Sequence, residues 1–179
     1  MNKIFCILTL ITISIGTASA ASCEEARSRM LRAGTESDID KKLELLKKSA
    51  HECAAADTYI TLANGYLQNN QPSLALKWLE SAEIYIGSNN DLVLGSWFAL
   101  KAEAHIQQNN LCKASNDLLK AKERLGKNHE MIKEIDLAFE YKRSQQVINK
   151  QTLNCMLTAS KSAFSKGVSI RPSINVTIP

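Results

Sequence analysis

The sequence lacks the motifs that most enzymes and nucleic-acid-binding proteins display. Its seven glycines are scattered singly, so no glycine-rich loop is available to hold a phosphate. His51, His105 and His129 lie in no nucleophile motif, and no Cys-x-x-Cys pair indicates a redox or zinc site. The 22 basic residues barely exceed the 18 acidic ones, whereas recognition of a phosphate backbone needs many converging cations. We therefore expect no enzyme, no catalytic residue, no cofactor or metal, and no nucleic acid partner.

Long hydrophobic runs are also missing, except at the start of the chain. Lys3 is followed by the apolar run Ile4–Ile15 and then by small residues that finish at Ala20. This pattern predicts a secretory signal peptide over residues 1–20, cleaved after Ala20. A membrane-spanning helix needs roughly twenty apolar residues, so we expect a periplasmic or secreted protein with no membrane span in its mature form. A signal anchor that stays in the membrane is the alternative.

What the sequence does contain is a spaced pattern that occurs twice, with a 39-residue period. The first set is Tyr59, Leu62, Ala63, Tyr66, Ala75, Leu79 and Ala82, and the second is Phe98, Lys101, Ala102, His105, Ala114, Leu118 and Ala121. The three- and four-residue intervals place each set on one stripe of a helix. The pattern predicts helices over about 57–68, from Pro72 to a break at 87–90, over about 97–108, and over 111–125. A fixed period of this size is typical of stacked helical hairpins.

The repeated pattern resembles the tetratricopeptide repeat (TPR) family, in which the first helix has an aromatic, Leu, small, aromatic sequence and the second has small, large apolar, small. Lys101 and His105 depart from it, since Leu and Tyr are usual there, and the family's usual period is 34. The resemblance implies an all-α fold: a right-handed solenoid of about three helical hairpins over residues 21–166, with a C-terminal capping helix and an extended tail or linker over 167–179. Residue His105 is expected to be a packed core histidine.

Two flanking stretches can be interpreted as degraded copies of this pattern. Upstream, Leu43, Leu46 and Ala50 take second-helix positions, and residues 23–33 would supply the first helix. Downstream, a further 39-residue step reaches Leu137, Glu140, Tyr141, Ser144, Leu153, Leu157 and Ser160. The alternative there is a long capping pair of helices that covers the end of the stack.

The mature chain has four cysteines, and an even number in an oxidising compartment favours disulfides, with three pairings open. In the repeat register that the TPR resemblance implies, Cys23 begins one helix and Cys53 follows its antiparallel partner. Cys112 and Cys155 fall near equivalent places in neighbouring hairpins. We therefore expect the disulfides Cys23–Cys53 and Cys112–Cys155. A lipidated Cys23 is the alternative.

The TPR resemblance also implies a binding surface, the concave face formed by the first helix of each hairpin. The side chains expected there are Arg27, Leu31, Ile60, Asn64, Leu67, Gln68, Ala99, Glu103, Ile106 and Gln107. Such a mixed apolar and amide surface suits an extended or helical protein segment. The predicted function is a periplasmic or secreted interaction scaffold, whose partner is a protein of the cell envelope.

The C-terminal residues predict something different from a helix. Val168, Ile170, Ile174, Val176 and Ile178 alternate with polar residues, as in a strand. This stretch resembles the lead-in to an OmpA-like peptidoglycan-binding domain. The resemblance implies an alternative function, a structural cell-envelope module that spaces or dimerises a wall-binding part lying beyond the chain. A tail with no such role is the other alternative, and a homo-oligomer is expected if Trp78 or Trp97 is exposed.

Overall fold

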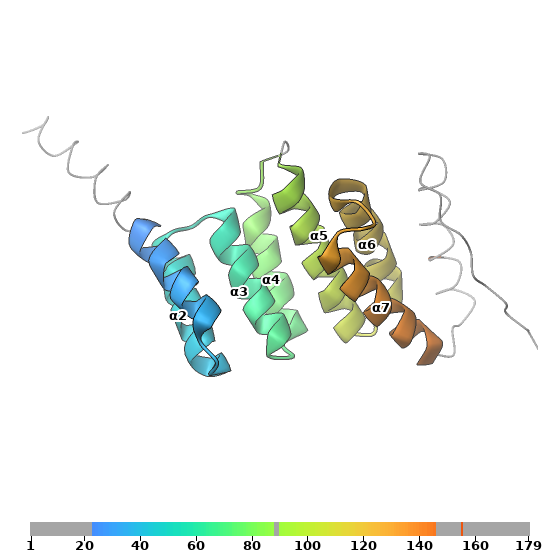
Figure 1. Ribbon diagram of the computed structural model, residues 1–179, viewed down its shortest axis with the longest axis horizontal. Coiled ribbons are helices and arrows are strands. Elements are labelled where there is room, and N and C mark those ends of the chain that lie inside the picture. Colours follow the sequence, from blue (N-terminus) through green and yellow to red (C-terminus); the bar gives the residue numbers. More distant parts are fainter. Residues whose placement is uncertain (1–22, 88–89, 146–154, 156–179) are drawn as a thin grey trace, which may run out of the picture. The chain divides into compact units, whose positions relative to one another are not determined.

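The computed structural model describes residues 23–87, 90–145 and 155 (Figure 1). All the regular secondary structure among these residues is helical, which confirms the expected all-α class. The chain divides after Gly87 into two compact units, and each is described by itself. The predicted signal peptide, the C-terminal tail and the positions Leu153, Leu157 and Ser160 lie outside the described residues.

The first unit contains a helix over residues 23–35 and the helices α2 (Ile39–Glu52), α3 (Ala56–Gln68) and α4 (Pro72–Glu83). Asp38 begins α2, because its carboxylate accepts the backbone N–H groups of Asp40 and Lys41 at 3.0 and 3.2 Å. Pro72 is the first residue of α4, where a missing N–H costs no helical hydrogen bond. Gly65 lets α2 approach α3 closely, since a Cβ there would lie 2.9 Å from a Leu46 methyl carbon.

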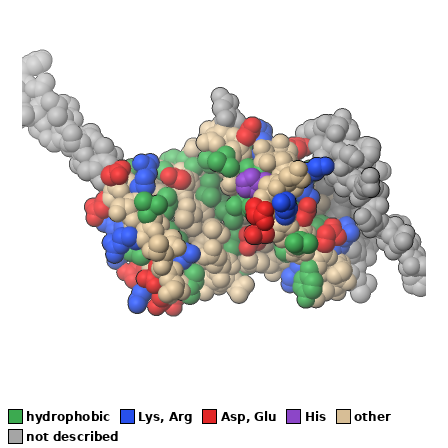
Figure 2. Space-filling view, viewed as in Figure 1, with side chains coloured by type: hydrophobic (Ala, Val, Ile, Leu, Met, Phe, Trp, Pro, Cys, Tyr) green, Lys and Arg blue, Asp and Glu red, His purple; other side chains and the backbone are tan. Residues whose placement is uncertain are grey.

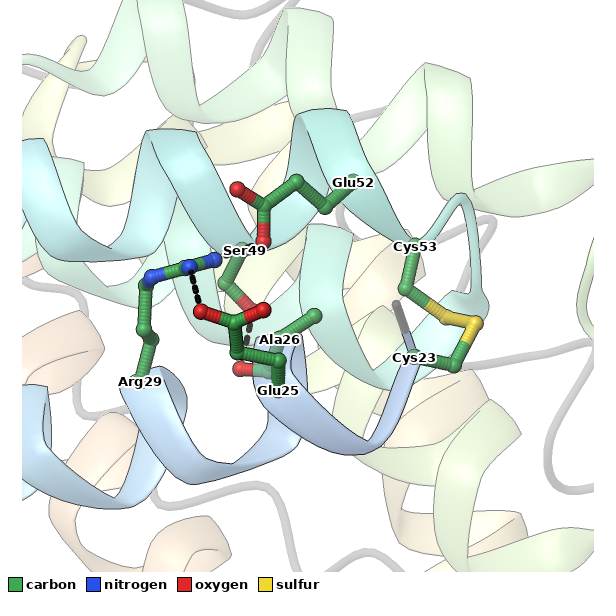
Figure 3. A network of polar contacts seen from close by, with 7 residues as sticks. All are labelled: Cys23, Glu25, Ala26, Arg29, Ser49, Glu52 and Cys53. Carbon is green, nitrogen blue, oxygen red and sulfur yellow. Dashed lines mark hydrogen bonds and ion pairs between the residues drawn. A yellow bond between two sulfur atoms is a disulfide. The ribbon is translucent and has the colours of Figure 1, made fainter. Parts of the chain in front are cut away.

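Helix 23–35 and α2 form an antiparallel pair that is joined at one end by a disulfide. Cys23 and Cys53 are bonded, with their Cα atoms 4.8 Å apart, as predicted (Figure 3). Nearby, the Ser49 hydroxyl donates to the backbone carbonyl of Ala26 at 2.7 Å, and the Arg29 guanidinium pairs with Glu25 and Glu52. The upstream stretch is therefore a helical hairpin, held by covalent, hydrogen-bonded and ionic contacts in addition to its buried residues Leu43, Leu46 and Ala50.

The second unit contains α5 (Asp91–Gln107), α6 (Leu111–Leu125) and α7 (Glu130–Gln145). Helix α5 begins well before its predicted start at 97, because the Asn90 side chain caps it by accepting the Val93 N–H at 3.1 Å. The Lys122 ammonium and the Asp136 carboxylate lie 2.5 Å apart and join α6 to α7. Cys112 and Cys155 form the second predicted disulfide, with Cα atoms 5.7 Å apart.

Hairpins α3–α4 and α5–α6 are closed by the same turn. Asn70 and Asn109 occupy the same place in the 39-residue repeat, and they have positive φ values of 51° and 58°. The backbone N–H of Gln71 donates to the carbonyl of Tyr66 at 2.9 Å, and that of Asn110 donates to His105 at 2.8 Å. This ring is the Schellman arrangement that ends helices at a left-handed residue. The sequence repeat is thus matched by a backbone repeat.

The predicted downstream 39-residue step is wrong for α7. It places Leu137 and Tyr141 at buried positions, but these side chains are 73% and 62% exposed. The side chains that α7 buries are Ile132, Ile135 and Phe139. They follow the α5 positions Phe98, Lys101 and His105 at a 34-residue spacing. The reason is the additional N-terminal turn of α5: Phe98 is the eighth residue of its helix, whereas Ile132 is the third residue of α7.

Candidate functional site

The first unit presents part of the predicted surface on helix 23–35. Leu31 is 70% exposed there. Arg27 is exposed too, with one guanidinium nitrogen 3.7 Å from a Glu24 carboxylate oxygen. Figure 2 shows acidic and basic side chains side by side on this unit, so the face in view has no dominant charge. A partner would find here one large apolar side chain among solvated ions.

The remaining part of the first unit's surface lies on α3. Ile60 and Asn64 are half-buried, one helical turn apart, and Gln68 is exposed one turn further on. The Gln68 side-chain oxygen accepts a 2.8 Å hydrogen bond from the Lys42 ammonium of α2. The three residues therefore form one accessible stripe, which offers an aliphatic group and two amides to a ligand.

Leu67 and Ile106 do not belong to the accessible surface, which corrects the sequence-based prediction. Their side chains are only 2% and 3% exposed, and Ala99 is fully buried. Leu67 and Ile106 lie in the last turn of their helices, and their carbonyls each accept the N–H of the positive-φ asparagine at 3.0 Å. The chain reverses at this turn, so a large aliphatic side chain there packs into the core. Truncating either residue would open a cavity instead of testing a binding surface.

In the second unit, the residues of the predicted surface that stay accessible on α5 are Glu103 and Gln107, both half-buried. The Gln107 amide donates to the Glu103 carboxylate over 3.5 Å. Burial raises the pKa of Glu103, and the Glu134 carboxylate on α7 raises it further. These two carboxylates belong to helices that pack against each other.

Helix α7 adds two surface residues that the sequence analysis had assigned to buried positions. Leu137 and Tyr141 follow Glu134 by about one and two helical turns and share its stripe. In the 34-residue register they correspond to Glu103 and Gln107 of α5. Hydrophobic and charged side chains are both visible over this helix in Figure 2. The signal that would have revealed this surface is a 34-residue spacing in the sequence. It separates Ile132, Ile135 and Phe139 of α7 from Phe98, Lys101 and His105 of α5.

The ionisable groups between α5 and α6 are part of the core. His105 is 7% exposed, as expected of a packed core histidine, and its Nε2 atom lies 3.6 Å from an Asp117 carboxylate oxygen. Burial lowers the pKa of His105 and raises that of Asp117, although each partner's charge opposes the shift. The Lys101 ammonium lies over the Trp97 ring, 4.3 Å from its centroid. Because His105 and Asp117 are covered, their contact belongs to the packing of α5 against α6.

Aromatic side chains occupy the corresponding place in the first unit. Tyr59 stacks on Trp78 with ring centroids 5.6 Å apart, and contacts Tyr85 at 5.5 Å. Trp78 is half-buried, and in the second unit Trp97 is buried. Trp97 is therefore an ordinary core residue, and the argument for self-association through an exposed tryptophan does not apply to it.

Among residues 23–87, 90–145 and 155, no group of three or more His, Cys, Asp or Glu side chains has the arrangement needed to hold a metal ion. In the same part of the chain, no helix is both long and apolar enough to cross a membrane. Comparisons of the chain with protein-family models, curated proteins and solved structures found no match. The TPR resemblance therefore depends on the repeated residues and turns themselves.

Proposed function

We propose that this protein is a periplasmic or secreted interaction scaffold of the TPR type, which binds a protein segment on the faces of its first helices. The observation that supports the proposal is the repeat of one hairpin at two places. Hairpins α3–α4 and α5–α6 share their buried small residues, their turn geometry and the 39-residue spacing. Repeats of this kind build extended binding surfaces.

The proposed overall arrangement is the right-handed solenoid that the resemblance implies. The first helices that would carry the binding faces are helix 23–35 and α3 in the first unit, and α5 and α7 in the second. Their accessible residues are a set of apolar and amide side chains interrupted by charges: Arg27, Leu31, Ile60, Asn64, Gln68, Glu103, Gln107, Leu137 and Tyr141. Amides can pair with the backbone of an extended ligand while the apolar side chains accept its anchors, which is a common mode of peptide recognition.

The location that we propose follows from the signal-like N-terminus and the cysteines. Residues 1–20 have the composition of a cleaved secretory signal. All four remaining cysteines are paired, Cys23 with Cys53 and Cys112 with Cys155. Stable disulfides belong to oxidising compartments, so the pairing supports a periplasmic or extracellular protein.

The proposal can be tested by crosslinked capture from a cell-envelope fraction with the oxidised mature chain. The test variant is Asn64→Ala with Gln68→Ala, which keeps Leu67 because its truncation would cost about 2–5 kcal/mol of stability. The matched control is Lys77→Ala with Glu80→Ala, two exposed residues of α4 in the same unit. We expect one specific protein to be lost with the test variant and retained with the control. Equal capture by both variants would reject the α3 surface as the binding site and favour the structural cell-envelope module.

A further inference from the structure

Helix α7 carries an apolar and acidic stripe that the described residues leave uncovered. Leu137 and Tyr141 are one turn apart and are 73% and 62% exposed. Glu134 precedes them on the same stripe, and Glu103 lies on α5, which packs against α7. We call Glu103, Glu134, Leu137 and Tyr141 the α7 face. Two large exposed apolar side chains one turn apart, next to a carboxylate, make this face a candidate contact surface.

The charges of the α7 face differ from those on the rest of α7. Glu130, Asp136 and Glu140 each pair with a cation, namely Lys133, Lys122 and Arg143. In contrast, no Lys or Arg of the described residues forms an ion pair with Glu103 or Glu134. A complementary ligand would therefore combine a cation with flanking apolar side chains.

The chain itself contains a segment of this composition. Residues 156–179 include no Asp or Glu, and Arg171 lies between apolar residues at 168, 170 and 174. Cys155 is bonded to Cys112 on α6, so this segment is tethered to the unit that carries the α7 face. The chain between Cys155 and Gly167 spans roughly 40 Å when it is extended. Since α7 is about 24 Å long, an extended tether is long enough to reach along the whole helix, and a helical one of roughly 18 Å reaches most of it.

We propose that residues 167–179 bind to the α7 face as an intramolecular ligand. Arg171 pairs with Glu103 and Glu134, and the neighbouring aliphatic side chains cover Leu137 and Tyr141. The disulfide raises the local concentration of the segment, which lets a small contact area suffice. The contact does not depend on the proposed function, because both of its sides belong to one unit of one chain. A partner that uses the same face would have to displace the segment.

Hydrogen exchange of the full oxidised chain tests this contact. We expect the backbone amides of residues 168–178 to exchange about tenfold more slowly than in the free peptide of the same sequence. Leu137→Ala should remove most of this protection. The matched control is Leu92→Ala, an exposed leucine on α5 of the same unit, at 62% exposure, which should leave the protection unchanged. Both leucines are exposed, so neither variant threatens folding. Exchange at the rate of the free peptide, or equal effects of the two variants, would overturn the proposal.

A charge exchange tests the ionic part of the same contact. Glu134→Arg alone should lose the protection of residues 168–178, and adding Arg171→Glu should restore most of it. A double variant that stays unprotected would assign the protection to another surface and reject the α7 face. Protection that increases with protein concentration would also reject the proposal, because it would assign the occupant to a second copy of the chain. Envelope capture is not part of either readout, so failure of the proposed function would leave these results unaffected.

Discussion

Hairpins α3–α4 and α5–α6 have the same backbone plan and different chemistry between their helices. Tyr66 and Trp78 of the first hairpin correspond to His105 and Asp117 of the second. Trp78 stacks on Tyr59, whereas His105 and Asp117 form a covered ionisable pair with 3.6 Å between Nε2 and the carboxylate oxygen. What does not change is the set of small residues, which are fully buried in both hairpins: Ala63, Ala75, Ala82, Ala102, Ala114 and Ala121. Close helix approach and the asparagine turn therefore set how the two helices of each hairpin align. The larger side chains adapt to that alignment.

This difference predicts that the two units respond differently to pH and similarly to packing changes. An aromatic contact is insensitive to protonation over the neutral range, while a buried His–Asp pair is not. A substitution at a shared alanine should affect both hairpins alike, because the neighbouring helix lies equally close. Substitutions at the corresponding residues of the two units can separate these effects.

The largest effect is expected from filling the shared small positions. Ala82→Leu and Ala121→Leu each enlarge the side chain at a fully buried site, which should destabilise the respective unit by about 1–3 kcal/mol. Lys77→Leu and Asn116→Leu are matched controls, because both residues are exposed and they occupy corresponding positions of α4 and α6. Native-state hydrogen exchange, analysed for each unit, measures the change. If one hairpin accepted its leucine without loss, the two would not share the same close packing.

Removing the ionisable side chain of His105 should eliminate a pH dependence whose source has no counterpart in the first hairpin, where Tyr66 takes the corresponding position. Burial holds the pKa of His105 below its ordinary value of 6.5, although the Asp117 charge acts in the opposite direction. The unfolded chain therefore takes up this proton first. Stability of the second unit is lost as the pH falls below about 6.5, until the folded His105 is itself protonated. The raised pKa of Asp117 acts with the opposite sign, because stability from this group is gained as the pH falls through its folded pKa.

The measurement is the unfolding free energy of the second unit between pH 7.5 and 5.5, for the native chain, His105→Tyr and His105→Gln. The tyrosine variant reproduces Tyr66 of the other hairpin, and the glutamine variant keeps a hydrogen-bonding side chain that does not titrate. We expect a flatter profile for both variants. An unchanged slope in the glutamine variant would show that another group causes the pH dependence.

The shared turn should be sensitive to the left-handed residue in both hairpins. Asn70→Ala and Asn109→Ala place a residue with a Cβ and no compensating side-chain amide at φ values of 51° and 58°. We expect a loss of about 1 kcal/mol in each unit, and a change of only a few tenths for the corresponding glycine variants. Urea unfolding of the four single variants tests this expectation. A stable alanine variant in one hairpin alone would mean that its turn can adopt another geometry.

Most of the helical architecture could be predicted because its signals are local. Asn and Pro residues interrupt the apolar stripes between α3 and α4, and the two disulfides followed from helix ends that meet. The early start of α5 was missed because residues 91–97 precede the repeated pattern, although Asn90 is a recognisable capping residue. A helical stripe therefore predicts a helix better than it predicts where the helix begins.

The candidate surface was predicted less well, because burial depends on what lies over a side chain. Leu67 and Ile106 have the spacing of surface residues but are covered near the turn. On α7, Ile132 and Leu137 are equally plausible members of an apolar stripe, and the choice between them depends on the extra turn of α5. A fixed 39-residue step could not account for that turn. The sequence of α7 alone therefore could not say which of its stripes is exposed.

The smallest effect is expected at Glu103, whose counterpart in the first hairpin is Asn64. Burial and the Glu134 charge raise the pKa of Glu103, so the folded state holds this proton more tightly than the unfolded state does. Stability from this group is therefore present below the unfolded value of about 4.5 and is lost as the pH rises through the folded pKa. In the Arg171→Ala background, which removes the proposed ion pair, Glu103→Asn should stabilise the second unit at pH 7 by less than about 1 kcal/mol, because the carboxylate is partly solvated, and this gain should disappear below pH 4.5. Thermal unfolding at pH 7 and pH 4 measures the difference, with the exposed Glu80→Gln on α4 as control. An equal gain from the control would assign the effect to net charge and not to the position that distinguishes the two hairpins.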